Sequence, residues 1–101
     1  MNQPDLTDIE ILVLCSLWNK VGFATGKKPA NIRFDTIYRP IKNTGIRKSD
    51  VKEALKELIK KGLARKYEKR NTYTLTPKGA ILASKICSES WDRIRDKYKH
   101  R

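Results

Sequence analysis

Apolar residues recur at the three- and four-residue spacing of an amphipathic helix in three segments, residues 7–21, 48–61 and 77–98. The pattern is clearest in residues 48–61, where charged side chains stand opposite an apolar stripe. That stripe consists of Val51, Ala54, Leu55, Leu58 and Ile59. Gly62 follows two lysines that suit the carboxyl end of a helix dipole. We therefore predict three long helices in these segments.

Side chains that cap helices stand at the start of each segment. Asp5 or Thr7 is expected to cap the first helix, and Ser49 or Asp50 the second. Thr76, followed by proline, starts the third helix with a hydroxyl cap and a residue suited to the first turn.

Shorter elements are predicted between the first two long helices. Residues 22–31 form a loop by their Gly, Pro and Asn content, and residues 32–34 alternate apolar and basic as a short strand does. Asp35 is expected to cap a helix over residues 35–42, which Pro40 keeps short or distorted. Gly45 then supplies the backbone angle of the next turn.

Residues 63–76 consist of two Tyr- and Thr-rich runs around the turn sequence KRNT, which predicts a β-hairpin. We place Tyr73 and Leu75 in the core. Arg65 and Lys66 project to opposite faces of their strand, so at most one of them shares a role with the hairpin tip.

The length of 101 residues allows a single domain, residues 1–101. With these elements its fold class is mainly α with a small β-hairpin, an α+β fold.

The charge of the chain is strongly positive, with 23 Lys and Arg against 11 Asp and Glu and a formal net charge of +12. Such a surplus in a small domain points to a polyanionic partner. The alternative is a lysine-rich surface kept for solubility or heat tolerance.

No targeting or membrane segment is expected. Glu10 and Ser16 interrupt the longest apolar run, and the first residues are acidic, unlike those of a signal peptide. Cys15 and Cys87 lie in apolar helical contexts, and we expect buried thiols, with a disulfide as the alternative. Buried thiols indicate a reducing compartment, and we expect a cytoplasmic, nucleoid-associated protein.

The segment from Ile32 to Ala83, and above all "VKEALKELIKKGLARK…YTLTPKG", resembles winged helix-turn-helix domains of archaeal and bacterial DNA-binding proteins. The resemblance implies a three-helix core with a wing and a long C-terminal helix. It also implies duplex DNA as the partner and a role in transcription regulation. Residues 48–61 would then be the recognition helix in the major groove, and residues 63–76 the wing on the backbone or minor groove.

The spacing of the recognition helix places a mostly cationic face outward. Glu53 is its acidic member and would repel phosphate unless it pairs with Lys56. The resemblance implies base contacts near the helix start and a phosphate contact further along. The expected DNA-binding residues are Arg47, Lys48, Ser49 and Lys52 for bases, Lys56 for phosphate, and Lys69, Arg70 and Asn71 at the wing tip. The alternative for each is a solvated side chain, which we favour for Lys60 and Lys61.

The last helix carries an apolar stripe beyond what a small domain needs to cover. Trp91, Ile94 and Tyr98 are therefore expected to pair with a second copy in a homodimer. The alternative is that this stripe folds back on the first helix within one chain.

Catalysis is not expected, because His100 is the single histidine and no nucleophile–base pair, phosphate-binding glycine loop or metal-ligand cluster is evident. We likewise expect no cofactor, metal or small-molecule ligand. Two alternatives to sequence-dependent DNA binding remain open. One is a non-specific chromatin or RNA-binding protein, and the other is a winged-helix module for protein interaction, which would favour an apolar exposed patch.

Overall fold

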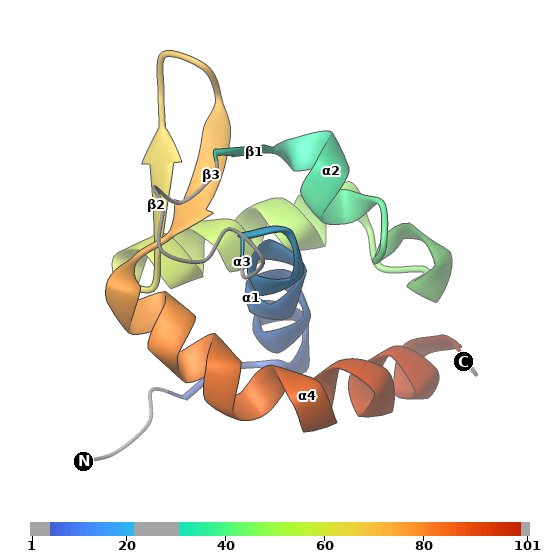
Figure 1. The fold of residues 1–101 in the computed structure, drawn as a ribbon. Coiled ribbons are helices and arrows are strands. Elements are labelled where there is room, and N and C mark those ends of the chain that lie inside the picture. The colour runs from blue at the N-terminus through green and yellow to red at the C-terminus, as the bar shows by residue number, and fades with distance from the viewer. Residues whose placement is uncertain (1–4, 22–30, 100–101) are drawn as a thin grey trace.

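The computed structural model describes residues 5–21 and 31–99, which form four α-helices, one 3₁₀ helix and three strands (Figure 1). In chain order these are α1 (Asp8–Val21), β1 (Ile32–Arg33), α2 (Phe34–Tyr38), η1 (Lys42–Thr44), α3 (Lys48–Lys60), β2 (Ala64–Tyr67), β3 (Thr72–Leu75) and α4 (Pro77–Lys99). The predicted α+β class is therefore confirmed, as are the three long helices and the hairpin.

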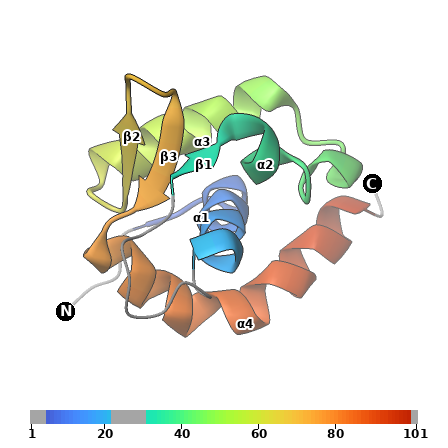
Figure 2. The ribbon, with the colours of Figure 1, turned by 45° about the horizontal axis from the view of Figure 1, so that its top comes forward.

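Helix α1 lies in the middle of the molecule, with α3 and the sheet on one side and α4 on the other (Figures 1 and 2). This position explains why almost every residue from Leu12 to Leu17 is apolar, since both sides of the helix are covered. Ser16 is fully buried among them, and its hydroxyl donates a 2.7 Å hydrogen bond to the carbonyl oxygen of Ile37. That bond ties α1 to α2 and satisfies the buried hydroxyl.

The three strands form one antiparallel sheet in the order β1-β3-β2. Tyr73 stands opposite Ile32 on one side and Lys66 on the other. Tyr73 and Leu75 are buried, at 8% and 3% exposure, as predicted. Asn71 ends the hairpin turn with φ of 52°, a left-handed conformation that asparagine tolerates better than most residues.

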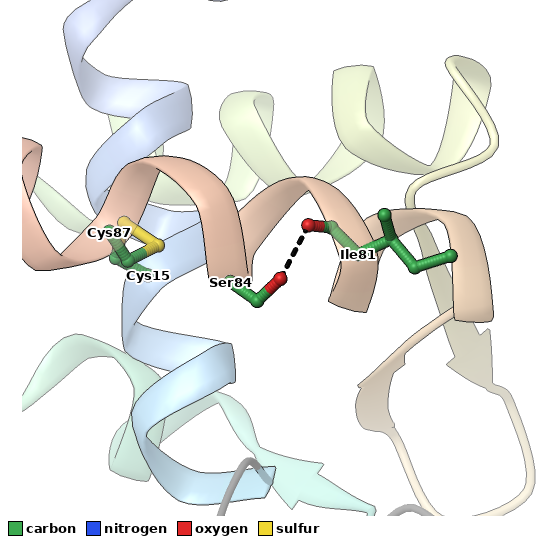
Figure 3. The surroundings of a disulfide bond; sticks show 4 residues. All are labelled: Cys15, Ile81, Ser84 and Cys87. Atoms are coloured by element: carbon green, nitrogen blue, oxygen red, sulfur yellow. Dashed lines mark hydrogen bonds between the residues drawn. A yellow bond between two sulfur atoms is a disulfide. The ribbon is translucent and has the colours of Figure 1, made fainter.

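Cys15 of α1 and Cys87 of α4 are joined by a disulfide, so the favoured expectation of two buried thiols is wrong (Figure 3). The helix pattern placed each cysteine on an inward face but could not show that the two faces meet. Their Cα atoms are 5.4 Å apart, a normal separation for a disulfide. The argument for a reducing compartment therefore loses its basis.

Two of the predicted caps are confirmed. Thr7 and Glu10 form a reciprocal capping box at the start of α1, with both bonds at 3.2 Å. The Thr76 hydroxyl accepts from the Gly79 N–H at 3.0 Å and donates to the carbonyl of Gly62 at 2.7 Å. Thr76 therefore starts α4 and also holds it against the end of α3.

The predictions for Ser49 and Asp35 as caps are wrong. Arg47 is the cap residue of α3, and the Asp50 carboxylate accepts its backbone N–H at 3.4 Å from within the first turn. Helix α2 begins one residue before Asp35, with Arg33 in the cap position, and ends at Tyr38 instead of continuing to residue 42. Pro40 lies in the following turn, which agrees with a short helix.

Gly45 and Gly62 have φ of +82° and +77°, so each occupies the left-handed region where glycine is favoured. The predicted loop at residues 22–31 lies outside the described residues except for Asn31, and so does His100. No helix within the described ranges is long and apolar enough to cross a membrane.

The C-terminal stripe packs on its own chain. Ile94 is 2% exposed within the core of the single chain, so the expectation that it faces a second copy is not met. Trp91 and Tyr98 are half-buried against the same core. The stripe folds back because the end of α4 continues along α1 and reaches η1.

Candidate nucleic-acid interface

The outer face of α3 carries a row of exposed lysines. Lys48, Lys52 and Lys56 follow one another at four-residue spacing, which places them on one side of the helix. The opposite side, including Val51 and Leu55, is buried in the core. The hydrophobic anchoring of α3 therefore fixes the direction in which the lysines project.

Two of these lysines lie over aromatic rings of α2. Lys48 Nζ is 5.9 Å from the ring centre of Tyr38, and Lys52 Nζ is 5.5 Å from that of Phe34. The two rings are stacked with centroids 6.0 Å apart and planes 10° apart. Tyr38 is held further by its hydroxyl, which donates a 2.8 Å bond to the carbonyl of Ile46. The aromatic pair thus lies under the ammonium groups of the first two lysines of the row.

A groove separates α3 from the sheet, with a cavity volume of about 460 Å³. We call it the cationic groove, since five cations and one carboxylate, Asp35, line it together with Asn71. Its cations are Arg33, Lys52, Lys56, Lys66 and Arg70, and its apolar floor consists of Phe34, Leu55, Ile59 and Tyr73. Five elements, β1, α2, α3, β2 and β3, and the hairpin turn therefore contribute to one positively charged depression.

The sheet supplies one side of the groove through Lys66. Lys66 stands opposite Tyr73 in the β2–β3 register, and its Nζ lies 5.9 Å from the Tyr73 ring centre. Arg65, the preceding residue, pairs with Thr74 and does not line the groove. The two side chains therefore differ in position, with Lys66 in the groove and Arg65 outside it.

The predicted DNA-binding residues are all exposed, and the structure brings four of them together. Lys52, Lys56, Arg70 and Asn71 line the cationic groove. The others lie around it: Lys48 over Tyr38, Arg47 in a separate hollow beside η1, and Ser49 and Lys69 exposed to solvent outside the groove.

The sequence pattern did not identify Arg33 as a site residue, and it did not decide between Arg65 and Lys66. Arg33 joins the groove because β1 pairs with β3, opposite Thr72. A two-residue strand gives too weak a local signal to reveal its partner. The alternation of Ile32, Arg33 and Phe34 was the one available sign that the arginine faces away from the core.

Ion pairs reduce the effective charge of part of α3. Lys56 pairs with Glu53 at 3.7 Å, and Lys60 pairs with Glu57 at 4.0 Å. Within the described ranges, no salt bridge involves Arg33, Lys52, Lys66 or Arg70. Four of the five groove cations therefore have no carboxylate partner in an ion pair within the described residues and stay available to an anion.

Lys61 was expected to be a solvated side chain, but it forms contacts within the protein. Its Nζ donates to Glu10 Oε1 at 2.8 Å and to the carbonyl of Asp5 at 2.7 Å. The Lys61 side chain is 28% exposed and that of Glu10 only 8%. Lys61 therefore joins the end of α3 to the start of α1 and takes no part in the exposed cationic face.

Helix α4, on the other side of α1, carries a smaller excess of positive charge. Over Pro77–Lys99 it has six Lys and Arg against three Asp and Glu. Residues 31–76, which contain α3 and the sheet, have 13 Lys and Arg against 5 Asp and Glu, so the excess is larger on their side.

Comparison with family models, curated proteins and solved structures finds no match to this chain. In the part of the chain that the structure describes, no group of three or more His, Cys, Asp or Glu side chains is placed to hold a metal ion.

Proposed function

We propose that the protein binds duplex DNA in the manner of a winged-helix domain and acts as a transcriptional regulator. In this arrangement α3 enters the major groove and the β2–β3 hairpin serves as the wing on the backbone or minor groove. The strand order β1-β3-β2, with the hairpin directly after α3, supports the winged-helix assignment.

The observation that carries the proposal is the convergence of α3, β1 and the hairpin on one cationic surface. Exposed lysines at four-residue spacing on a helix suit contacts with phosphates and with guanine in a major groove about as wide as a helix. The hairpin adds Lys69 and Arg70 beside them. A lysine-rich surface kept for solubility would not require this clustering of cations around one groove.

A salt series on duplex DNA tests the proposal. Fluorescence anisotropy would measure affinity for random and selected duplexes at several salt concentrations. If about six phosphates are contacted, the logarithm of affinity should fall against that of salt with a slope of about −5. Absence of duplex binding at low salt would overturn the proposal.

Two matched variants localise the binding surface. Lys52→Ala removes a groove cation and should weaken binding, whereas Lys85→Ala removes an exposed cation from α4 and should leave it unchanged. Equal losses for both variants would indicate general charge attraction. Tighter binding to an RNA duplex than to DNA would favour the alternative of an RNA-binding protein.

A further inference from the structure

The cationic groove combines a charged surface with an apolar surface. Binding a phosphate backbone requires only the charged one. Backbone contacts need cations and hydrogen-bond donors. Here the cations surround an apolar floor that includes Ile59. Among the described residues, three large apolar side chains are exposed by a third or more, namely Ile59, Tyr67 and Ile81. An anion with a flat apolar part would use both surfaces.

The cations stand at the boundary between the two surfaces. Lys52 Nζ lies 5.5 Å from the ring of Phe34, and Lys66 Nζ lies 5.9 Å from the ring of Tyr73. Both ammonium groups are therefore within reach of a ligand whose apolar part rests on the floor. Arg70 adds a guanidinium from the hairpin turn, which is suited to a bidentate contact with phosphate oxygens.

The volume and the polar groups narrow the class of ligand. A cavity of about 460 Å³ lies within the range of small-molecule sites. The Asn71 side chain offers both a donor and an acceptor, which suits the edge of a heterocyclic base. Asp35 is the one carboxylate among five cations, so the groove keeps a strong preference for anions.

From these features we infer that the cationic groove binds a nucleotide, with the base on the apolar floor and the phosphates among Lys52, Lys66 and Arg70. The nucleotide is either free in solution or an unpaired residue at the end of a nucleic-acid strand, since both present the same chemistry. The hollow beside η1 does not compete as a site, because Arg47 is accompanied there by Asp50.

A consequence for DNA follows, and it rests on the proposed function. Lys52, Lys56, Arg70 and Asn71 belong both to the groove and to the expected DNA-binding set. A free nucleotide held in the groove should therefore compete with duplex DNA.

Direct titration of the full chain tests the inference without DNA. A nucleoside triphosphate, inorganic triphosphate and the uncharged nucleoside are compared by calorimetry at low ionic strength. Base stacking on the floor should make the nucleotide bind about tenfold more tightly than inorganic triphosphate. The nucleoside alone should bind far more weakly than either anion.

Ile59→Ser should remove the advantage of the nucleotide over triphosphate, because it removes exposed apolar surface from the floor. Ile81→Ser is the matched control, since Ile81 is 59% exposed on α4 and should not affect the ratio. Lys66→Ala should weaken the binding of the nucleoside triphosphate and of inorganic triphosphate by the same factor.

A second comparison distinguishes the two sources of the nucleotide. A duplex with a short single-stranded overhang is compared with the same blunt duplex. If the protein prefers the overhang and Ile59→Ser abolishes this preference, the nucleotide belongs to a nucleic-acid strand. If the free nucleoside triphosphate binds more tightly than inorganic triphosphate, the nucleotide comes from solution. The inference is overturned if inorganic triphosphate binds as tightly as the nucleoside triphosphate and the duplex with the overhang binds no more tightly than the blunt duplex. Because the calorimetric arm contains no DNA, its outcome is independent of the proposed duplex binding.

Discussion

Cys15 and Cys87 are 72 residues apart in sequence and bonded to each other across the interface of α1 and α4. Both are almost inaccessible, at 0% and 4% exposure. The bond closes a long loop that includes β1, α2, α3 and the hairpin. It therefore restricts the unfolded chain over most of the domain.

Reduction of this disulfide should lower the free energy of unfolding by about 4 kcal/mol, the loop-closure value for a loop of this length. Urea unfolding with and without a reductant measures the difference. The control is Cys15→Ala combined with Cys87→Ala, which should not respond to the reductant. An oxidised and a reduced protein with the same urea midpoint would contradict the prediction.

Lys61→Ala should destabilise the protein by about 2 kcal/mol, because it leaves the nearly buried Glu10 carboxylate without its cation. Lys60→Ala is the matched control, since Lys60 is 79% exposed and its partner Glu57 is 4.0 Å away. That change should stay within about 0.5 kcal/mol. Chemical denaturation of both variants measures the contrast, and equal effects would show that the ion pair with Glu10 contributes nothing.

Gly79→Ala should destabilise the protein by about 1–3 kcal/mol through overpacking. A Cβ at Gly79 would overlap the carbonyl oxygen of Leu63, which also accepts the Thr76 N–H at 3.2 Å. Backbone cannot move aside as a flexible side chain can. Thermal unfolding measures the loss, with Lys85→Ala on the exposed face of the same helix as the control. A melting temperature equal to that of the control would refute the close packing of α4 on Leu63.

Lys97 should make a pH-dependent contribution to stability. Its Nζ donates a 2.9 Å hydrogen bond to Asp8 Oδ2, and this bond, with the attraction of the Asp8 charge, raises the pKa of Lys97 above its ordinary value of 10.5. A raised pKa in the folded state means that the contribution is complete below 10.5 and is lost as the pH rises through the folded value.

The stability difference between wild type and Lys97→Gln should therefore shrink between about pH 10.5 and about pH 12. Urea midpoints across this range measure it, and Lys85→Gln should show no such trend. The effect is small because the Lys97 side chain is 68% exposed, so water screens its attraction to Asp8. A difference that stays constant with pH would contradict the assignment.

If the protein binds duplex DNA as proposed, Lys52→Ala and Arg47→Ala should relax its sequence preference. Removal of either base-reading side chain should reduce discrimination between sequences by about 1–3 kcal/mol. Lys69→Ala with Arg70→Ala should instead weaken all sequences alike and reduce the salt slope by about 1 for each phosphate that is no longer neutralised. Competition binding on a set of duplex sequences separates these two results. Sequence-dependent losses in the hairpin variant would assign base recognition to the hairpin.

Much of the local structure was predictable because it depends on neighbouring residues. The apolar spacing of α3, the hydroxyl and proline at the start of α4 and the turn at Gly45 each act within a few positions of the chain. The short elements were harder to predict. Aspartate is a common helix cap, which favoured Asp35 as the start of α2. The pairing of Ile32 and Arg33 with β3 instead decides where the strand ends and where α2 begins.

The three long helices, the hairpin and the cationic outer face of α3 could be read from the chain alone, since periodicity and charge are properties of consecutive residues. Which distant residues meet was settled by the packing of the fold. That packing joined Cys15 to Cys87, buried Ile94 within its own chain, paired Lys61 with Glu10, and placed Arg33 and Lys66 across the groove from Lys52. Each of these depends on how α1, α3, α4 and the sheet lie against one another, and no local pattern records that arrangement.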